Sequence, residues 1–350
     1  MNNYFAETRL IARVLTLGSD HQNTSQYLLN NFEEVSFINT LLHNKVSIPF
    51  LKKLETNIGN QINFYKAFPS LVELNRRMCA KTAKERALFE QVSENLLSNG
   101  IDYILIKSDG NFPHESDNVD VIIKPKELKT TTRLLKAVGY SEISQIREPH
   151  KFLFRKMSDY DALPLHIHTV VEWEGTQFLD SDKLWRRKRN SKGDWSFSIP
   201  SPEDCLLITA AHLFFENHEV KLSDIIKVSS VTKNQSFNWS YVFDHSRTLH
   251  WGDSFVLTLL LINTAHEKLF SERIFQQDTF SILQNAYSYI KLAKGFSSLS
   301  ERDFAEIPYS LSALFFLKRV LGDSNLSIFQ RVQHINWIVS DIARRRTRGV

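Results

Sequence analysis

Cysteine is scarce in this 350-residue sequence, which contains only Cys79 and Cys205. Two cysteines far apart in the chain support neither a disulfide framework nor a cysteine-based zinc site. A protein with so few thiols fits a reducing compartment, and we therefore predict a cytoplasmic location.

Long apolar runs are also missing. The most apolar stretch covers residues 255–262, far short of the roughly 20 residues that a membrane-spanning helix needs. The opening sequence, MNNYFAETRLIARV, has neither the basic start nor the continuous apolar core of a signal peptide. We expect no membrane partner, and we interpret residues 255–262 as part of a buried core helix.

Charge of one sign is not in excess either. Lysine and arginine together number 43 and aspartate and glutamate 39, which gives a net charge of +4. This excess is too small over the whole chain to indicate nucleic-acid binding. The strongest basic run, KLWRRKRNSK at residues 183–192, could neutralise a triphosphate or a polyanionic acceptor. A solvated helix end or linker is the favoured interpretation of that run.

The pattern of apolar residues divides the chain into three predicted regions. Hydrophobic residues make up 42% and charged residues 23% of the sequence, which is typical of a folded protein. Residues 1–98 have helical periodicity, which ends at Asn99-Gly100, a natural helix stop. Residues 99–198 predict a small α/β module, and residues 199–350 predict a helical domain that begins with Ser201 as N-cap. The expected class is α+β, with a small mixed sheet between two helical regions.

Within the central module, short apolar or β-branched runs predict strands, and Pro125 opens a helix. The last two predicted strands lie too close in sequence for a helical crossover, so we expect a mixed sheet. The predicted strands cover residues 103–106, 119–123, 151–157 and 163–171.

The first two predicted strands flank a polar loop. The sequence is YILIK, then SDGNFPHESDN, then VDVII, so Lys107 ends one strand while Asp117, Asn118 and Asp120 stand where the next begins. Because residues two apart in a strand share a face, Asn118 and Asp120 project together. Carboxylate and amide oxygens beside a Ser/Gly loop can hold a divalent cation next to a phosphate.

A second polar pair lies on the predicted strand at residues 163–171, where His166 and His168 share one face. If this strand pairs with residues 119–123, the histidines join Asn118 and Asp120 in one polar strip. The two histidines could instead begin a zinc hydrolase site, which would need a third ligand such as His212 or His218. His168 could also simply form a hydrogen bond at a sheet edge.

Together these spaced motifs resemble a family of uncharacterised prokaryotic nucleotidyltransferases with the DNA polymerase beta-like nucleotidyltransferase fold. In that family a helix runs into a "gI-x-yilLKG" strand, followed by a "DiDlLv" strand, a "DlHw" strand and a helical C-terminal region. The segments that match are NGIDYILIKS (99–108), NVDVII (118–123), LHIHTVVEW (165–173) and SPEDCLLITAAHLFFEN (201–217).

The resemblance implies transfer of a nucleoside monophosphate from an NTP to an acceptor hydroxyl, with Mg²⁺ or Mn²⁺ as cofactor. In the family, two carboxylates at i and i+2 and a third on a neighbouring strand bind two divalent ions. Asp120 matches the second carboxylate, while Asn118 and His166 stand at the first and third positions. Asp117 could replace the first carboxylate if the strand entrance is bulged.

The resemblance also places Lys107 and Ser108 beside the nucleotide phosphates, and His166 and His168 with Asp120 in the catalytic set. The acceptor stays open: a small molecule, a sugar, a protein or an RNA end. Because two expected carboxylates are replaced, an alternative is a weak or inactive member of the same fold that binds nucleotide or a partner without turnover.

Overall fold

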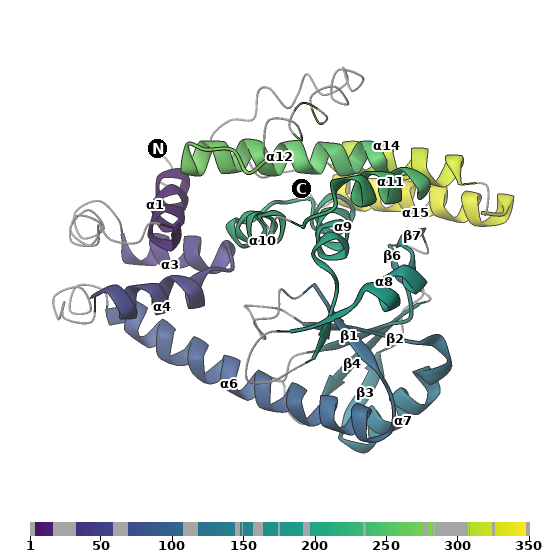
Figure 1. Cartoon of the computed structure of the whole chain (residues 1–350), viewed down its shortest axis with the longest axis horizontal. Helices are drawn as coiled ribbons and strands as arrows, with labels where there is room; N and C mark the ends of the chain where they lie inside the picture. Colours follow the sequence, from purple (N-terminus) through teal and green to yellow (C-terminus); the bar gives the residue numbers. More distant parts are fainter. Residues whose placement is uncertain are drawn as a thin grey trace.

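A computed structural model describes residues 4–16, 33–58, 69–107, 118–143, 148, 150–156, 164–173, 176–191, 197–233, 236–275, 279, 281, 283, 307, 309–323 and 326–347. The N-terminal part is helical, as predicted. Its long last helix runs from the N-terminal helices to the far side of the sheet (Figure 1) and ends before Gly100, whose φ of 73° is a conformation that suits glycine. These helices are α1 (Tyr4–Thr16), α3 (Glu34–His43), α4 (Ser47–Ile58) and α6 (Pro69–Ser98).

A five-stranded sheet follows, in the order β1-β2-β5-β4-β3. Strands β2 and β5 are parallel and the other neighbours are antiparallel, so the predicted mixed sheet is confirmed. Between β2 and β3 lie a 3₁₀ turn, η1 (Pro125–Glu127), and helix α7 (Leu128–Ala137), as the sequence predicted from Pro125. The strands are β1 (Tyr103–Ile106), β2 (Val119–Ile123), β3 (Tyr140–Ile143), β4 (Lys151–Lys156) and β5 (Leu165–His168).

The strand predicted over residues 163–171 is divided in two. Strand β5 ends at His168, and β6 (Val171–Trp173) forms a separate hairpin with β7 (Thr176–Leu179). The division follows from a change of partner, because β5 pairs with β2 and β4 whereas β6 pairs with β7. Helix α8 (Ser181–Arg187) and a short ribbon of β8 (Arg189–Asn190) and β9 (Ser198–Ile199) complete this region.

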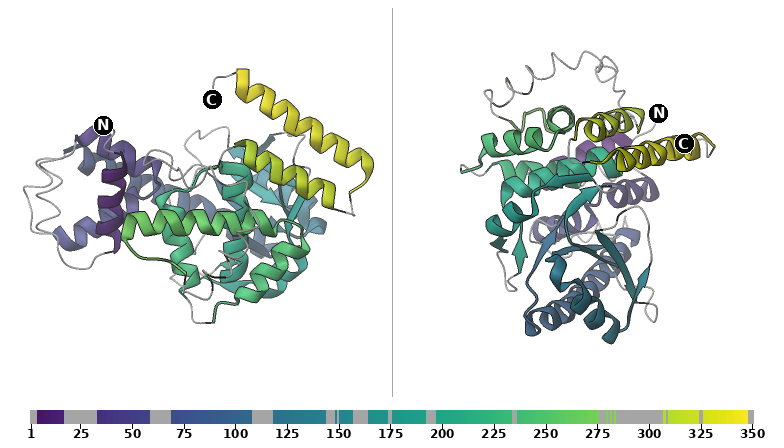
Figure 2. Two further views of the ribbon diagram at one scale, coloured as in Figure 1. Left: turned by 90° about the horizontal axis from the view of Figure 1, so that it is seen from above. Right: turned by 90° about the vertical axis from the view of Figure 1, so that its right-hand side faces the viewer.

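The C-terminal part is helical. Ser201 caps its first helix as predicted, because its side chain accepts a hydrogen bond from the Asp204 N–H. Helix α9 lies between the sheet and the last helices (Figures 1 and 2). No helix in the described part of the chain is long and apolar enough to cross a bilayer. The elements are α9 (Pro202–His212), a π-helical turn η2 (Leu213–Asn217), α10 (Leu222–Thr232), α11 (Trp239–Thr248), α12 (Gly252–Phe270), α14 (Tyr309–Gly322) and α15 (Ile328–Thr347).

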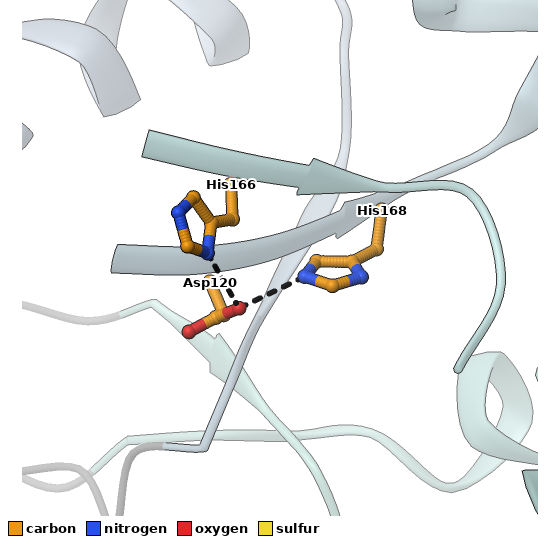
Figure 3. Close-up of side chains that lie close together, drawn as sticks. All are labelled: Asp120, His166 and His168. Atoms are coloured by element: carbon orange, nitrogen blue, oxygen red, sulfur yellow. Dashed lines mark hydrogen bonds and ion pairs between the residues drawn. The ribbon is translucent and has the colours of Figure 1, made fainter. Parts of the chain in front are cut away.

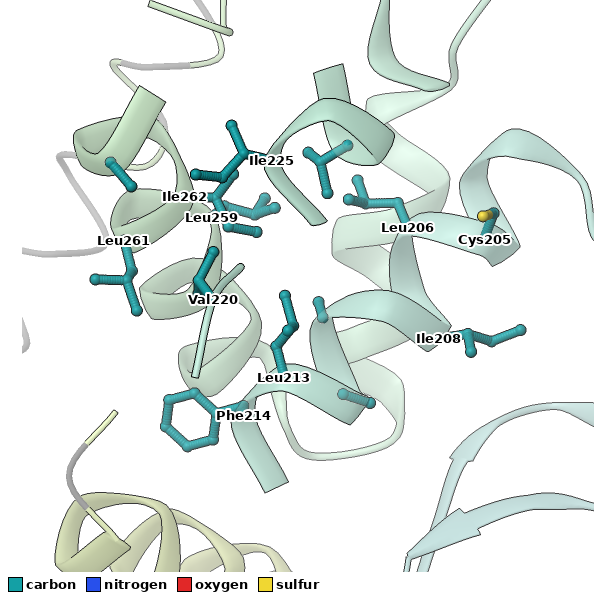
Figure 4. Packing of buried hydrophobic residues seen from close by; sticks show 14 of the residues in the cluster. Cys205, Leu206, Ile208, Leu213, Phe214, Val220, Ile225, Leu259, Leu261 and Ile262 are labelled. Atoms are coloured by element: carbon teal, nitrogen blue, oxygen red, sulfur yellow. The ribbon is translucent and has the colours of Figure 1, made fainter. Parts of the chain in front are cut away.

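The two faces of the sheet pack against different cores. On β1, Tyr103 and Leu105 contact the α6 side, whereas Ile104 and Ile106 contact the core built by the helical regions. This alternation is the period of a strand. The larger core contains the apolar segment 255–262, which confirms the predicted buried helix, and part of it is shown in Figure 4. The region boundaries at residues 98 and 198 stay predictions.

Asp120 lies on the sheet face that the helical core covers. It stands between Val119 and Val121, which pack on the opposite face, and two residues before Ile122, which packs in the helical core. The alternation of strand β2 therefore directs this single carboxylate toward helix α9 and η2.

Candidate functional site

Asp120 and the two histidines meet across the parallel pair β2 and β5. In the register, Asp120 lies opposite His166 and Ile122 lies opposite His168. The Nε2 atom of His168 is 2.9 Å from Asp120 Oδ1, and the Nδ1 atom of His166 is 3.4 Å from the same oxygen. Figure 3 shows both rings turned toward the carboxylate. The pairing of these two strands, the condition under which the sequence placed Asp120 and the histidines together, is present in the structure.

The carboxylate is buried but stays ionised. Burial by itself would raise the pKa of Asp120, but the Lys107 ammonium and the two histidines outweigh it and hold the pKa well below its ordinary value. Burial lowers the pKa of His168, although Asp120 opposes that shift. A neutral His168 imidazole therefore donates its Nε2 proton to an anionic Asp120.

His166 differs from His168 in its hydrogen bonding. Its buried Nδ1 atom lies 3.4 Å from Asp120 Oδ1, within ion-pair distance, but forms no hydrogen bond. A buried polar atom left in this state costs about 1–3 kcal/mol. Such an atom, directed at a carboxylate, is available to bind a ligand or a cation.

Lys107 supplies the positive charge of the site. Its Nζ atom lies 3.3 Å from Asp120 Oδ1 and 3.3 Å from Glu216 Oε2. Burial would lower the pKa of this ammonium, but the two carboxylates raise the pKa above its ordinary value. The backbone of Lys107 has a φ of 63°, which costs a non-glycine residue about 1–2 kcal/mol. A hydrogen bond from Lys227 Nζ to the Lys107 carbonyl, 2.9 Å long, supports this conformation.

Glu216 closes the site from the helical side, on the π-helical turn after α9. It pairs with Lys107, with Lys151 at 3.6 Å and with Nδ1 of His212. Burial raises the pKa of Glu216, but His212 and the two lysines hold the pKa well below its ordinary value. The interpretation from sequence did not include Glu216 in the site. Its i, i+4 spacing from His212 was the one local signal, because Lys107 is 109 residues away.

A cavity of about 40 Å³ opens beside these charges. Its lining includes the charged or polar side chains of Lys107, His168 and Glu172 and the aromatic side chains of Trp173 and Phe178. This volume holds water molecules. It is too small for a nucleotide in the present arrangement of side chains.

Not every predicted site residue can be placed. Asp117 and Ser108 lie outside the described residues, so their roles stay predictions. Asn118 is half-buried and immediately precedes β2. His218 is engaged elsewhere, because its Nδ1 lies 3.0 Å from the Phe214 carbonyl.

The basic run at residues 183–192 is not simply a solvated end. Arg187 pairs with Glu203 and Asp204, and Lys188 pairs with Asp102. These contacts join α8 to the start of α9 and to the residue before β1. The favoured interpretation of this run as a solvated helix end is therefore wrong for its central residues, which connect elements of the fold.

In the described part of the chain, Asp120, His166 and His168 form a group that could hold a metal ion. Each offers one donor atom, and the three donors lie within 4.8 Å of one another. The alternative zinc site with His212 or His218 lacks support, since those rings contact Glu216 and the Phe214 carbonyl.

The chain was compared with solved structures, with curated protein sequences and with models of protein families. Two solved structures have low overall similarity to this chain. A lincosamide antibiotic adenylyltransferase, LnuA, with lincomycin bound has 16% identity, covers 43% of this chain and 96% of its own, and has a TM-score of 0.31. The antibiotic-resistance factor ANT(2'')-Ia has 8% identity, covers 59% of this chain and 99% of its own, and has a TM-score of 0.30.

No curated protein sequence matches the chain. A family model does match it: residues 115–266 fit the model described as uncharacterised nucleotidyltransferase. This segment contains Asp120, both histidines of the site and Glu216. The resemblance seen in the sequence is thereby confirmed, and residues 115–266 carry the pattern of the nucleotidyltransferase family.

Proposed function

We propose that this protein transfers a nucleoside monophosphate from an NTP to an acceptor hydroxyl at the site centred on Asp120. One observation carries the proposal: a buried, ionised carboxylate lies within a cluster of charged and polar groups, inside the segment that matches the nucleotidyltransferase family. Perturbed ionisable groups gathered around a cavity are typical of catalytic sites.

Each residue has a role in this proposal. Lys107 neutralises the NTP phosphates, because its fixed ammonium lies where a triphosphate would approach Asp120. Asp120 and His166 are ligands for a divalent cation, predicted from the sequence as Mg²⁺ or Mn²⁺. Asn118 and Asp117 remain predicted metal ligands, Ser108 remains a predicted neighbour of the phosphates, and the cytoplasmic location also stays a prediction.

The residues present fit one divalent cation better than two. Asp120 Oδ1, His168 Nε2 and the unpartnered His166 Nδ1 converge from two strands. A bound cation would supply charge stabilisation to the reacting phosphate. A second ion would need another carboxylate, but Glu216 is engaged by Lys107, Lys151 and His212.

The cavity beside the cluster favours a small-molecule acceptor. Its lining combines the aromatic side chains of Trp173 and Phe178 with the carboxyl group of Glu172. Apolar walls with a few polar groups are typical of small-molecule sites. A sugar, a protein side chain or an RNA end stays among the acceptors that the test below must include.

The second candidate function is binding without turnover. The neutral Asn118 and the imidazole of His166 stand where the family has carboxylates, and this replacement favours a weak or inactive member. Such a protein would bind NTP through Lys107 and the cluster but would not transfer its nucleotide.

Two measurements on the full chain separate these functions. A nucleotide at about 100 times its Kd stabilises a protein by about 2.7 kcal/mol, which raises Tm by several degrees. Transfer is measured with α-labelled NTP and two sources of acceptors, a deproteinised cell extract and a heat-inactivated protein fraction of the same cells. The proposal expects both a thermal shift and label incorporation, with incorporation lost in Asp120→Asn and kept in the exposed control Asp244→Asn. A shift without incorporation supports binding alone, and incorporation that survives Asp120→Asn contradicts the site.

A further inference from the structure

The donor atoms around Asp120 differ in kind from those of a magnesium site. The group consists of a single carboxylate and two imidazoles. Mg²⁺ prefers oxygen ligands and binds largely through charge, whereas imidazole nitrogen suits the later first-row transition metals. The chemistry of this donor set therefore favours a different cation from the one that the family implies.

The separations of the donors also suit a single transition-metal ion. Bonds of about 2.0–2.2 Å place neighbouring ligand atoms about 2.8–3.6 Å apart in octahedral or tetrahedral geometry. Asp120 Oδ1 lies 2.9 Å from His168 Nε2 and 3.4 Å from His166 Nδ1. The unpartnered Nδ1 of His166 would gain in a metal bond the interaction that it lacks.

The charge around the site opposes a cation held by charge alone. Lys107 lies 3.3 Å from the same Asp120 oxygen and neutralises it. The Lys107 ammonium and the Asp120 carboxylate together carry no net charge. A hard cation therefore gains little by electrostatics, while a transition metal still gains from bonding to nitrogen.

The carboxylates of Glu216 and Glu148, which a second ion could otherwise use, are already paired with cations. Lys107 occupies the space between Asp120 and Glu216. Glu216 also pairs with Lys151 and His212, and Glu148 pairs with Lys151 at 3.1 Å. The ammonium thus supplies positive charge where a second metal would otherwise bind.

We propose that Asp120, His166 and His168 form a mononuclear site for a divalent transition-metal ion, which binds there in preference to Mg²⁺. The inference deepens the proposed function, because it names the cation of the same site and rests on that assignment. Lys107 then acts as a built-in positive charge beside the metal.

The test is metal binding by the full-length, untagged, metal-free protein in the absence of nucleotide. Co²⁺ is titrated by its visible absorption, and Zn²⁺, Mn²⁺ and Mg²⁺ are titrated by calorimetry. We expect one Co²⁺ per chain and Zn²⁺ binding at least about 100-fold tighter than Mg²⁺. His166→Ala and His168→Ala should each weaken Co²⁺ binding by at least about 10-fold.

Replacing one imidazole ligand by a carboxylate tests the metal preference more directly. His166→Asp restores a carboxylate, so it should tighten Mg²⁺ binding and weaken Co²⁺ binding relative to the wild type. The matched control is His43→Asp. His43 is a half-exposed histidine on α3 that pairs with Glu219 and does not belong to the site. This variant should change neither the Mg²⁺ affinity nor the Co²⁺ affinity. Circular dichroism of each variant confirms that it is folded.

Three results would overturn the inference. They are Mg²⁺ binding as tight as Zn²⁺ binding, Co²⁺ binding that is unchanged in both histidine variants, and a stoichiometry of two Co²⁺ ions per chain with both ions lost in the histidine variants. Failure of the metal inference is distinguishable from failure of the proposed function. Nucleotide transfer supported by Mg²⁺ would keep the transferase and reject the transition metal, whereas selective Co²⁺ binding without transfer would do the reverse.

Discussion

Two clusters of charged side chains lie at opposite ends of α9 and differ in how completely their buried groups are paired. The Asp204 cluster joins α8 to the start of α9, and the Asp120 cluster joins the sheet to the end of α9. The Asp204 cluster comprises Arg187, Ser201, Glu203, Asp204 and Tyr241. The Asp120 cluster comprises Lys107, Asp120, His166, His168 and Glu216.

In the Asp204 cluster both carboxylates are fully engaged. Asp204 accepts hydrogen bonds from Ser201 Oγ at 2.8 Å, Tyr241 OH at 2.7 Å and Arg187 Nε at 3.3 Å. Glu203 accepts from Arg187 and from the Asn238 N–H. The Arg187 guanidinium also lies 4.0 Å above the Tyr241 ring. A polar network satisfied to this degree is rigid and leaves nothing for a ligand to bind.

The Asp120 cluster has the opposite character. One of its buried nitrogens has no partner, its central lysine has a left-handed backbone, and a cavity reaches it. The comparison teaches that burial of charge does not by itself mark a functional site. Incomplete satisfaction of the buried groups, next to a cavity, distinguishes the candidate site from the structural cluster.

The largest expected effect is on stability, at the Asp204 cluster. Arg187→Met leaves the carboxylates of Glu203 and Asp204 buried without their cation. We expect the free energy of unfolding to fall by about 3–5 kcal/mol, measured by urea denaturation. Arg186→Met, at an exposed position of the same helix, is the control. A loss in Arg187→Met no larger than in this control would show that the cluster is not structural.

The next effect is on activity, at the Asp120 cluster. Glu216→Gln keeps the shape of the side chain but removes the anion that holds Lys107 and Lys151. We expect nucleotide transfer to fall by about 10–100-fold, as for other residues that orient a ligand. Glu219→Gln, whose partner His43 is half-exposed, should keep full transfer activity. Equal activity in both variants would remove Glu216 from the site.

A smaller effect concerns pH, at the edge of the cavity. Burial raises the pKa of Glu172 from 4.5 to about 7, against a hydrogen bond from the His150 N–H, and Glu148 adds to the rise. Because the folded protein holds this proton more tightly than the unfolded chain, stability falls as pH increases from about 4.5 to 7. We expect this group to contribute a loss of about 1–3 kcal/mol across that window.

Glu172→Gln should remove this part of the pH dependence and make the protein more stable than the wild type at about pH 8. The nearby ionisable groups are Glu148, His150 and Lys151, and they are unchanged in the variant. Urea denaturation at several pH values measures the effect, with the exposed Glu94→Gln as control. A variant that follows the wild-type profile would show that Glu172 is ionised normally.

The smallest effect is expected from an exposed ion pair. Lys318 on α14 pairs with Asp253 on α12, and both side chains are more than half exposed. Lys318→Met should change the free energy of unfolding by about 0.5 kcal/mol or less, because water screens such pairs. A loss approaching that of Arg187→Met would contradict the distinction between buried and exposed charge on which the comparison depends.

Much of the fold could be predicted from the sequence where the apolar pattern was strong. The strands at residues 103–106 and 119–123 and the cap at Ser201 are as predicted, because buried strands and N-caps have local signatures. Strand β3 was missed because three of its four residues are exposed, so it has no alternating pattern. The hairpin of β6 and β7 was missed because a change of strand partner leaves no mark in composition.

The sequence predicted the residues that the sheet contributes to the candidate site but not those that the helical region contributes. Asp120, His166 and His168 were identified because period-two spacing brings them to one face once the strands pair. Glu216 was not, because its contact with Lys107 depends on how the helical region packs on the sheet. The role of Arg187 was missed for the same reason: its partners lie on a different element.

The most direct test of the central claim compares NTP labelled at the α-phosphate with NTP labelled at the γ-phosphate. With a deproteinised extract as acceptor, the account predicts that α-label enters the product, that pyrophosphate is released, and that both are lost in Asp120→Asn. Transfer of the γ-label, or α-label transfer that Asp120→Asn leaves intact, would contradict it.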